Sequence, residues 1–122
     1  MAVNYTVAVK NARLSAVVTQ IGSTGVLEIG TAGMASILAT ITLNATAGTA
    51  ATGVLTFSGF PKSDTADATG TAAAARIRTA PGGTDIVTGL TVGTSGADII
   101  LDSVNITTGQ TVTINSASIT HA

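Results

Sequence analysis

The C-terminal third of the chain, residues 70–122, alternates short β-branched runs with glycine-bearing turns. Thr, Ser, Gly and Asn separate its apolar residues, which are Ile77, Ile86, Val87, Leu90, Val92, Ile99, Leu101, Val104, Ile106, Val112, Ile114 and Ile119. Apolar residues spaced in this way are typical of short antiparallel strands that each bury one face. This third of the chain therefore predicts a packed sheet and offers almost no chemically reactive side chain.

One segment near the N-terminus has the spacing of an amphipathic helix. Its apolar stripe consists of Leu14, Val17, Val18 and Ile21. These positions follow the i, i+3, i+4, i+7 rule, which predicts a helix over residues 12–21. Asn11 is the expected N-cap and Gly22 the expected C-cap. A strand is the alternative, because two valines and a threonine of this segment are β-branched.

The rest of the chain is predicted to be strand and turn. We expect strands at 26–29, 35–43, 54–57, 72–79, 85–92, 98–101 and 111–119. Residues 44–53 are of low complexity and are expected to form either a loop or a hairpin, and residues 62–71 have the composition of a polar loop. About seven or eight strands with one helix predict a single mainly β domain over residues 1–122, an antiparallel β-sandwich or jelly roll with a short N-terminal helix.

Residues 1–10 precede the expected helix and have two interpretations. In the first they are an N-terminal arm that adds an edge strand to a neighbouring subunit. In the second they are an ordinary first strand of the same domain. Alternation in the segment YTVAV would place Tyr5, Val7 and Val9 on one side, so these three are candidate partner contacts.

Charge and aromatic content narrow the functional classes. Charged residues make up 9% of the chain and aromatic residues 2%. A surface of Thr, Ser, Gly and Ala suits close packing against another protein, and the lack of a basic stripe argues against nucleic acid. The only tight basic pair, Arg76 and Arg78, should share one strand face. It is predicted to form ion pairs with Asp residues at the surface or at an interface, and is a second candidate partner contact.

No set of residues predicts catalysis, a metal or a cofactor. The chain has no cysteine and one histidine, His121, which is expected to be part of an unstructured end. Asp64 and Asp67 suggest either a weak calcium loop or Asx-turn capping, but the spacing of a calcium hand is absent. No apolar run is long enough to span a bilayer. The segment MAVNYTVAVKNARL has no apolar stretch behind a basic one, so we do not expect it to act as a secretory signal. We therefore expect a non-enzymatic protein without membrane contact.

Three stretches together resemble small virion structural proteins of tailed bacteriophages and prophages. They are KNARLSAVVTQIGSTGVLEIGT, GVLTFSGFPKSDTADATGTAAAARI and GLTVGTSGADIILDSVNITTGQTVTINSASIT, at residues 10–31, 53–77 and 89–120. The likeness covers most of the chain and is clearest outside residues 30–53. Its motifs are largely compositional.

The resemblance implies a capsid decoration or cement protein with a β-sandwich fold and no enzymatic residues. Its expected partners are the major capsid protein and copies of itself, and its expected location is the capsid exterior after assembly in the host cytoplasm. A tail or neck component is the first alternative, and a host-surface or glycan-binding module is the second.

Overall fold

The computed structural model describes residues 5–120, and its helix α1 (Val7–Ile21) begins earlier than expected. Thr6 is the N-cap, because its side-chain oxygen accepts a hydrogen bond from the Val9 N–H at 3.3 Å. The predicted start at residue 12 is therefore wrong, and so is the N-cap role of Asn11. Instead, the Asn11 Oδ1 accepts a hydrogen bond from the Gly53 N–H at 2.9 Å.

The early helix start also corrects the expectation of a strand or extended arm for residues 7–10. Residues 7–10 form the first helical turn, and residues 1–4 lie outside the described part of the chain. The β-branched valines suggested a strand, but a threonine cap followed by the buried stripe of the helix favours helix. Leu14 and Ile21 are buried and Val17 and Val18 pack against the core, as predicted.

The helix ends where the sequence indicated. Gly22 has a φ of +76°, a left-handed conformation that costs glycine little, and its N–H donates to the Val18 carbonyl at 3.2 Å. The chain then turns directly into the first strand.

The described residues are mainly β, as predicted. The strands are β1 (Val26–Gly30), β2 (Ile37–Thr42), β3 (Gly48–Ala51), β4 (Val54–Phe57), β5 (Lys62–Thr65), β6 (Gly70–Thr71), β7 (Ala74–Arg78), β8 (Asp85–Gly93), β9 (Ile99–Leu101), β10 (Asn105–Ile106) and β11 (Thr111–Thr120), with one 3₁₀ turn, η1 (Ala32–Met34). Each expected strand is present, with the same ends for β4 and with ends shifted by one or two residues for the others. Strand β3 forms a hairpin with β4, which was one of the two expectations for residues 44–53. Strands β5, β6 and β10 were not predicted, and β5 and β6 lie in a segment expected to be a polar loop.

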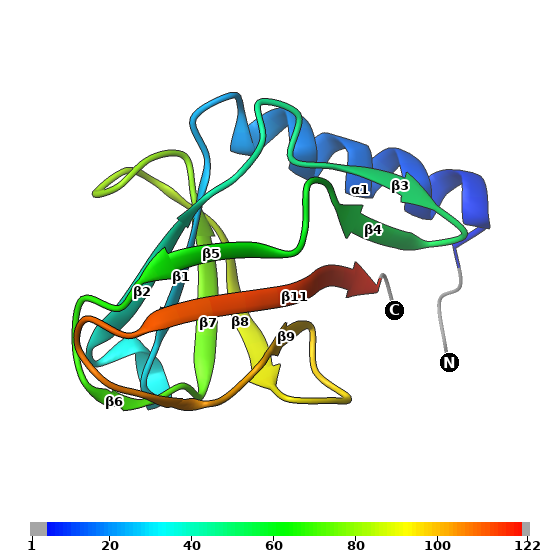
Figure 1. Cartoon of the computed structure of the whole chain (residues 1–122). Coiled ribbons are helices and arrows are strands. Elements are labelled where there is room, and N and C mark those ends of the chain that lie inside the picture. The colour runs from blue at the N-terminus through cyan, green and yellow to red at the C-terminus, as the bar shows by residue number, and fades with distance from the viewer. Residues whose placement is uncertain (1–4, 121–122) are drawn as a thin grey trace.

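Most strands belong to one curled sheet with the order β2-β1-β7-β8-β9-β11-β4-β3. The long strand β11 pairs with β9 on one side and with β5 and then β4 on the other. Figure 1 shows β5 and β11 crossing in front of β1, β7 and β8. The Asp67 N–H, just after β5, donates to the Leu38 carbonyl of β2 at 2.7 Å. This hydrogen bond joins the segment that follows β5 to β2, the edge strand of the curled sheet.

This arrangement corrects the expectation of a purely antiparallel sheet and does not confirm a sandwich or jelly roll. Strands β8 and β9 are parallel, with Val92 opposite Ile99. Parallel neighbours are normally joined by about a dozen residues or more, whereas here residues 94–98 suffice. Asp98, at the end of this loop, binds back to β8, because its Oδ2 accepts hydrogen bonds from both the N–H and the hydroxyl of Thr91 at 3.1 Å.

The buried core of the described residues is aliphatic except for Phe57. Its largest fully buried side chains are Ile21, Leu27, Ile29, Leu38, Leu55, Ile77, Ile99, Leu101, Ile114 and Val112. Helix α1 lies along the β3–β4 hairpin and closes that end of the core. The opposite side of α1 faces away from the sheet.

Candidate functional site

The first cluster of functional side chains lies on neighbouring strands β1 and β7. Glu28 stands directly opposite Arg76 in the antiparallel register. The Arg76 Nε is 2.6 Å from the Glu28 Oε1, and Glu28 is only 6% exposed. A buried carboxylate needs a cationic partner of this kind, because desolvation penalises an unpaired charge.

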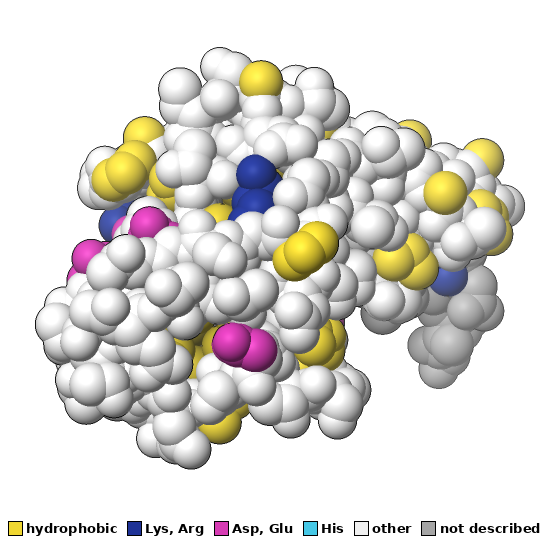
Figure 2. Space-filling model, viewed as in Figure 1, with side chains coloured by type: hydrophobic (Ala, Val, Ile, Leu, Met, Phe, Trp, Pro, Cys, Tyr) yellow, Lys and Arg dark blue, Asp and Glu magenta, His cyan; other side chains and the backbone are white. Residues whose placement is uncertain are grey.

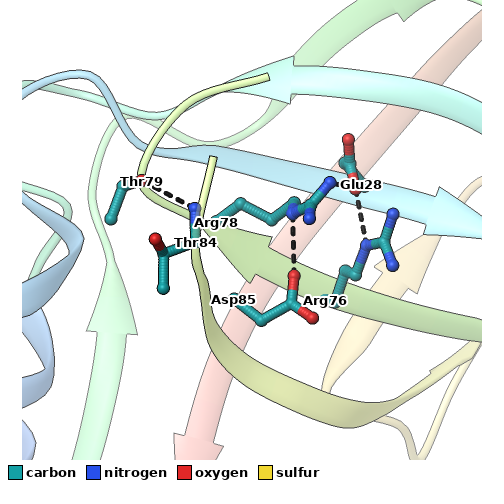
Figure 3. A network of polar contacts seen from close by, with 6 residues as sticks. All are labelled: Glu28, Arg76, Arg78, Thr79, Thr84 and Asp85. Carbon is teal, nitrogen blue, oxygen red and sulfur yellow. Dashed lines mark hydrogen bonds and ion pairs between the residues drawn. The ribbon is translucent and has the colours of Figure 1, made fainter. Parts of the chain in front are cut away.

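Arg78 extends the cluster from β7 to β8. Its Nη1 is 3.9 Å from the same Glu28 oxygen, and its Nε is 2.7 Å from the Asp85 Oδ1. The latter contact is an ion pair rather than a directed hydrogen bond. Figure 3 shows Arg78 reaching between the two carboxylates, beside the turn in which the Thr84 N–H donates to the Thr79 Oγ1 at 3.1 Å.

The prediction that Arg76 and Arg78 share a face is confirmed, because both reach Glu28. An aspartate partner is found for Arg78, whereas the buried Glu28 was not predicted as a partner. About a fifth of each arginine side chain is exposed. The cluster pairs two cations with two carboxylates across three strands, so its charge is used to connect β1, β7 and β8. The role of Arg76 and Arg78 in partner binding stays a prediction.

The second candidate lies at the start of α1. The exposed large hydrophobic side chains of the described residues are Tyr5, Val7 and Val9, at 43%, 53% and 42% exposure. Figure 2 shows hydrophobic side chains at the right-hand end of the molecule, where α1 begins, while most of this face is neither hydrophobic nor charged. The three residues predicted as partner contacts are therefore accessible, although helical rather than extended backbone presents the two valines.

Helical geometry places Val7 and Val9 on opposite sides of α1. At about 100° per residue, Val7 falls on the same side as Leu14 and Ile21. It stays exposed because the β3–β4 turn ends beneath Lys10 and Asn11, one turn further along the helix. Val9 falls on the opposite side, together with Arg13, whose Cζ lies 4.6 Å from the centroid of the Tyr5 ring.

Sequence reasoning missed the outward side of this helix. Ala12, Arg13 and Ala16 are all exposed beside Val9. The available signal was that residues 1–27 contain two of the five Lys and Arg residues and none of the six Asp and Glu residues. Charge asymmetry along a chain points to an interacting surface.

Residues 5–120 offer no other arrangement with an evident chemistry. They enclose no pocket, and no three metal-ligating side chains lie together in them. Asp64 lies exposed on β5 and Asp67 in the loop that comes after it, while His121 is outside the described residues. No described helix is both long and apolar enough to cross a membrane.

No model of a protein family matches the chain, and comparison with curated proteins and with solved structures finds no significant match. The resemblance to virion proteins therefore stays a hypothesis. The function of the chain has to be inferred from its own residues and geometry.

Proposed function

We propose that this chain is a non-enzymatic virion structural protein, a capsid decoration protein that binds the outside of the major capsid protein shell and stabilises it. The observation that carries the proposal is that all the exposed large hydrophobic side chains of the described residues, Tyr5, Val7 and Val9, lie within five residues at the start of α1, on an otherwise weakly charged β body. Exposed hydrophobic side chains confined to one end of a small domain favour contact with another protein.

The composition of the chain supports the same role. A Thr-, Ser-, Gly- and Ala-rich surface packs closely without the desolvation cost of many charged groups. In a shell, many copies of a weak contact act together through symmetry, so that no single strong site is required. The proposed partners are the major capsid protein and further copies of this chain, with no role for nucleic acid or membrane.

Co-sedimentation with capsid shells tests the proposal. Expanded shells that lack the protein are mixed with increasing amounts of the purified chain and pelleted. We expect saturable binding at a fixed ratio to the major capsid protein, and a higher temperature of shell disruption after binding. Shells already saturated with the protein are the control and should take up no more.

Absence of binding would contradict the decoration role. If the protein were then found in purified tails or necks, a tail or neck component would replace it. A glycan-binding module would be indicated if neither heads nor tails contained the protein and it bound host-surface polysaccharide instead.

A further inference from the structure

We propose that α1 docks onto the capsid protein through its outer face, defined as Val9, Ala12, Arg13 and Ala16, and that the surface it meets is apolar and carries a carboxylate. This inference rests on the proposed function and adds to it the contact surface and the chemistry of the partner. It replaces strand addition by residues 1–10 with docking of a preformed helix, because residues 7–10 are already helical.

The outer face is weakly charged for a solvent-facing side of a helix. Its four residues fall within an arc of about 100°, on the side away from the buried Leu14, and the exposed, uncharged Gln20 lies in the same arc further along the helix. All four are exposed, and Arg13 is the only charged residue among them. Surface helices normally carry charged and polar residues on this side. The two alanines leave room for the backbone of α1 to approach another surface closely.

Charge complementarity identifies the partner's polar group. Arg13 lies over the Tyr5 ring, and within the described residues it makes no ion pair. A guanidinium that stacks on an aromatic face still presents N–H groups at its edge, and these fit a carboxylate in two-point geometry. Because residues 1–27 contain no Asp or Glu, that carboxylate must come from outside this part of the chain.

A second copy of the chain fits this face poorly. The other large hydrophobic side chains of the described residues are buried or half-buried, so a second copy would have to offer the same helix. Antiparallel packing of two such helices about Ala12 would bring the two Arg13 side chains together, with no carboxylate on either helix to neutralise them. A different protein with an acidic and apolar surface avoids this repulsion.

Matched substitutions in the shell-binding assay test the inference. Ala16→Glu places a negative charge on the outer face, and Ser15→Glu places the same charge one residue earlier, about 100° around the helix. Both positions are exposed and glutamate is a good helix former, so circular dichroism and thermal melting should match the unsubstituted protein. We expect Ala16→Glu to weaken shell binding about tenfold and Ser15→Glu to change it less than about twofold.

Substitutions at Arg13 test the carboxylate. Arg13→Glu should weaken shell binding about tenfold or more, whereas Arg13→Lys keeps the charge and should retain part of the affinity. Binding by the unsubstituted protein should also fall as salt is raised.

The outcomes separate the docking face from the proposed function. If the unsubstituted protein does not bind shells, both are wrong. If it binds and the Ala16→Glu and Ser15→Glu variants bind equally well, the decoration role stands and the docking face is wrong. Sedimentation equilibrium of the protein alone tests whether a second copy of the chain binds the outer face. Self-association that Ala16→Glu abolishes would assign the face to a second copy and overturn the inference.

Discussion

At the residue scale, Glu28 has the most demanding environment in the described chain. It is the only buried charged residue among residues 5–120, and two arginines of β7 approach one of its carboxylate oxygens. Burial of a carboxylate is tolerated here because Arg76 lies directly opposite on the neighbouring strand. The ion pair therefore depends on the register of β1 and β7, and helps to exclude a shifted register.

We predict that Glu28→Gln destabilises the protein by about 1–3 kcal/mol. The amide keeps the shape of the side chain but leaves Arg76 without a neutralising charge in a mostly buried position. The cost lies below that of a fully buried pair because both arginines are partly exposed. Urea unfolding measures the change.

Asp102→Asn is the matched control for Glu28→Gln. Asp102 is exposed, so the same chemical change should alter the unfolding free energy by less than about 0.5 kcal/mol. Equal effects of the two substitutions would mean that the Glu28 ion pair adds nothing to stability.

At the element scale, α1 shows how local signals compete. Residues 5–9 alternate in the manner of a strand, and valine at two of these positions favours that state. The Thr6 cap and continuity with the buried stripe of Leu14 and Ile21 decide for helix. Because the helix begins at Val7, residues 7–10 form its first turn instead of an extended arm, and Val9 becomes part of the outer face.

Proline substitutions locate the helix start. Val7 is the first helical residue, where proline is tolerated, and Thr6 already has the extended backbone that precedes proline. Val7→Pro should therefore change stability by less than about 0.5 kcal/mol. Ala12→Pro falls inside the helix and should cost about 3 kcal/mol with a loss of helical circular dichroism. A harmless Ala12→Pro would instead support a helix that begins at residue 12.

In the whole molecule, a bulge in the pairing of β1 with β2 places Leu38 in the core together with Ala39 and Ile41. Strict alternation along β2 would place Ile37, Ala39 and Ile41 on one face and Leu38 on the other. The register of β1 and β2 skips Leu38 at a bulge, so that Gly30 pairs with Ile37 and Ile29 with Ala39. Leu38 is fully buried, whereas Ile37 is half-buried.

The packing around Leu38 predicts that truncating Leu38 destabilises the protein more than truncating Ile37, whereas strict alternation along β2 would predict the opposite order. A Cβ at Gly70 of β6 would lie 3.1 Å from the Leu38 Cδ2, so the side chain already fills the space beneath that strand. We expect Leu38→Ala to cost about 3 kcal/mol and Ile37→Ala to cost at least about 1 kcal/mol less, in line with their burial. Thermal and urea unfolding of both variants compare them, and a larger effect at Ile37 would contradict the described register.

Local sequence patterns were enough to predict the mainly β class, most of the strand positions, the buried stripe of α1, its glycine cap and the shared face of Arg76 and Arg78. Each of these depends on local periodicity or on conformational preference, which a few neighbouring residues encode. Tyr5, Val7 and Val9 are exposed, as candidate partner contacts must be, but the two valines lie on a helix instead of an extended segment. Their role in partner binding stays a prediction.

The other features of the fold could not be predicted from local patterns, because they depend on contacts between residues that are distant in the sequence. Strand β5, with the polar sequence KSDT, is a strand because β11 pairs with it from Thr65 opposite Thr111 to Lys62 opposite Ile114. Glu28 meets its arginines only when β1 lies beside β7. The curl of the sheet and the parallel pairing of β8 with β9 likewise join segments whose local patterns say nothing about their neighbours.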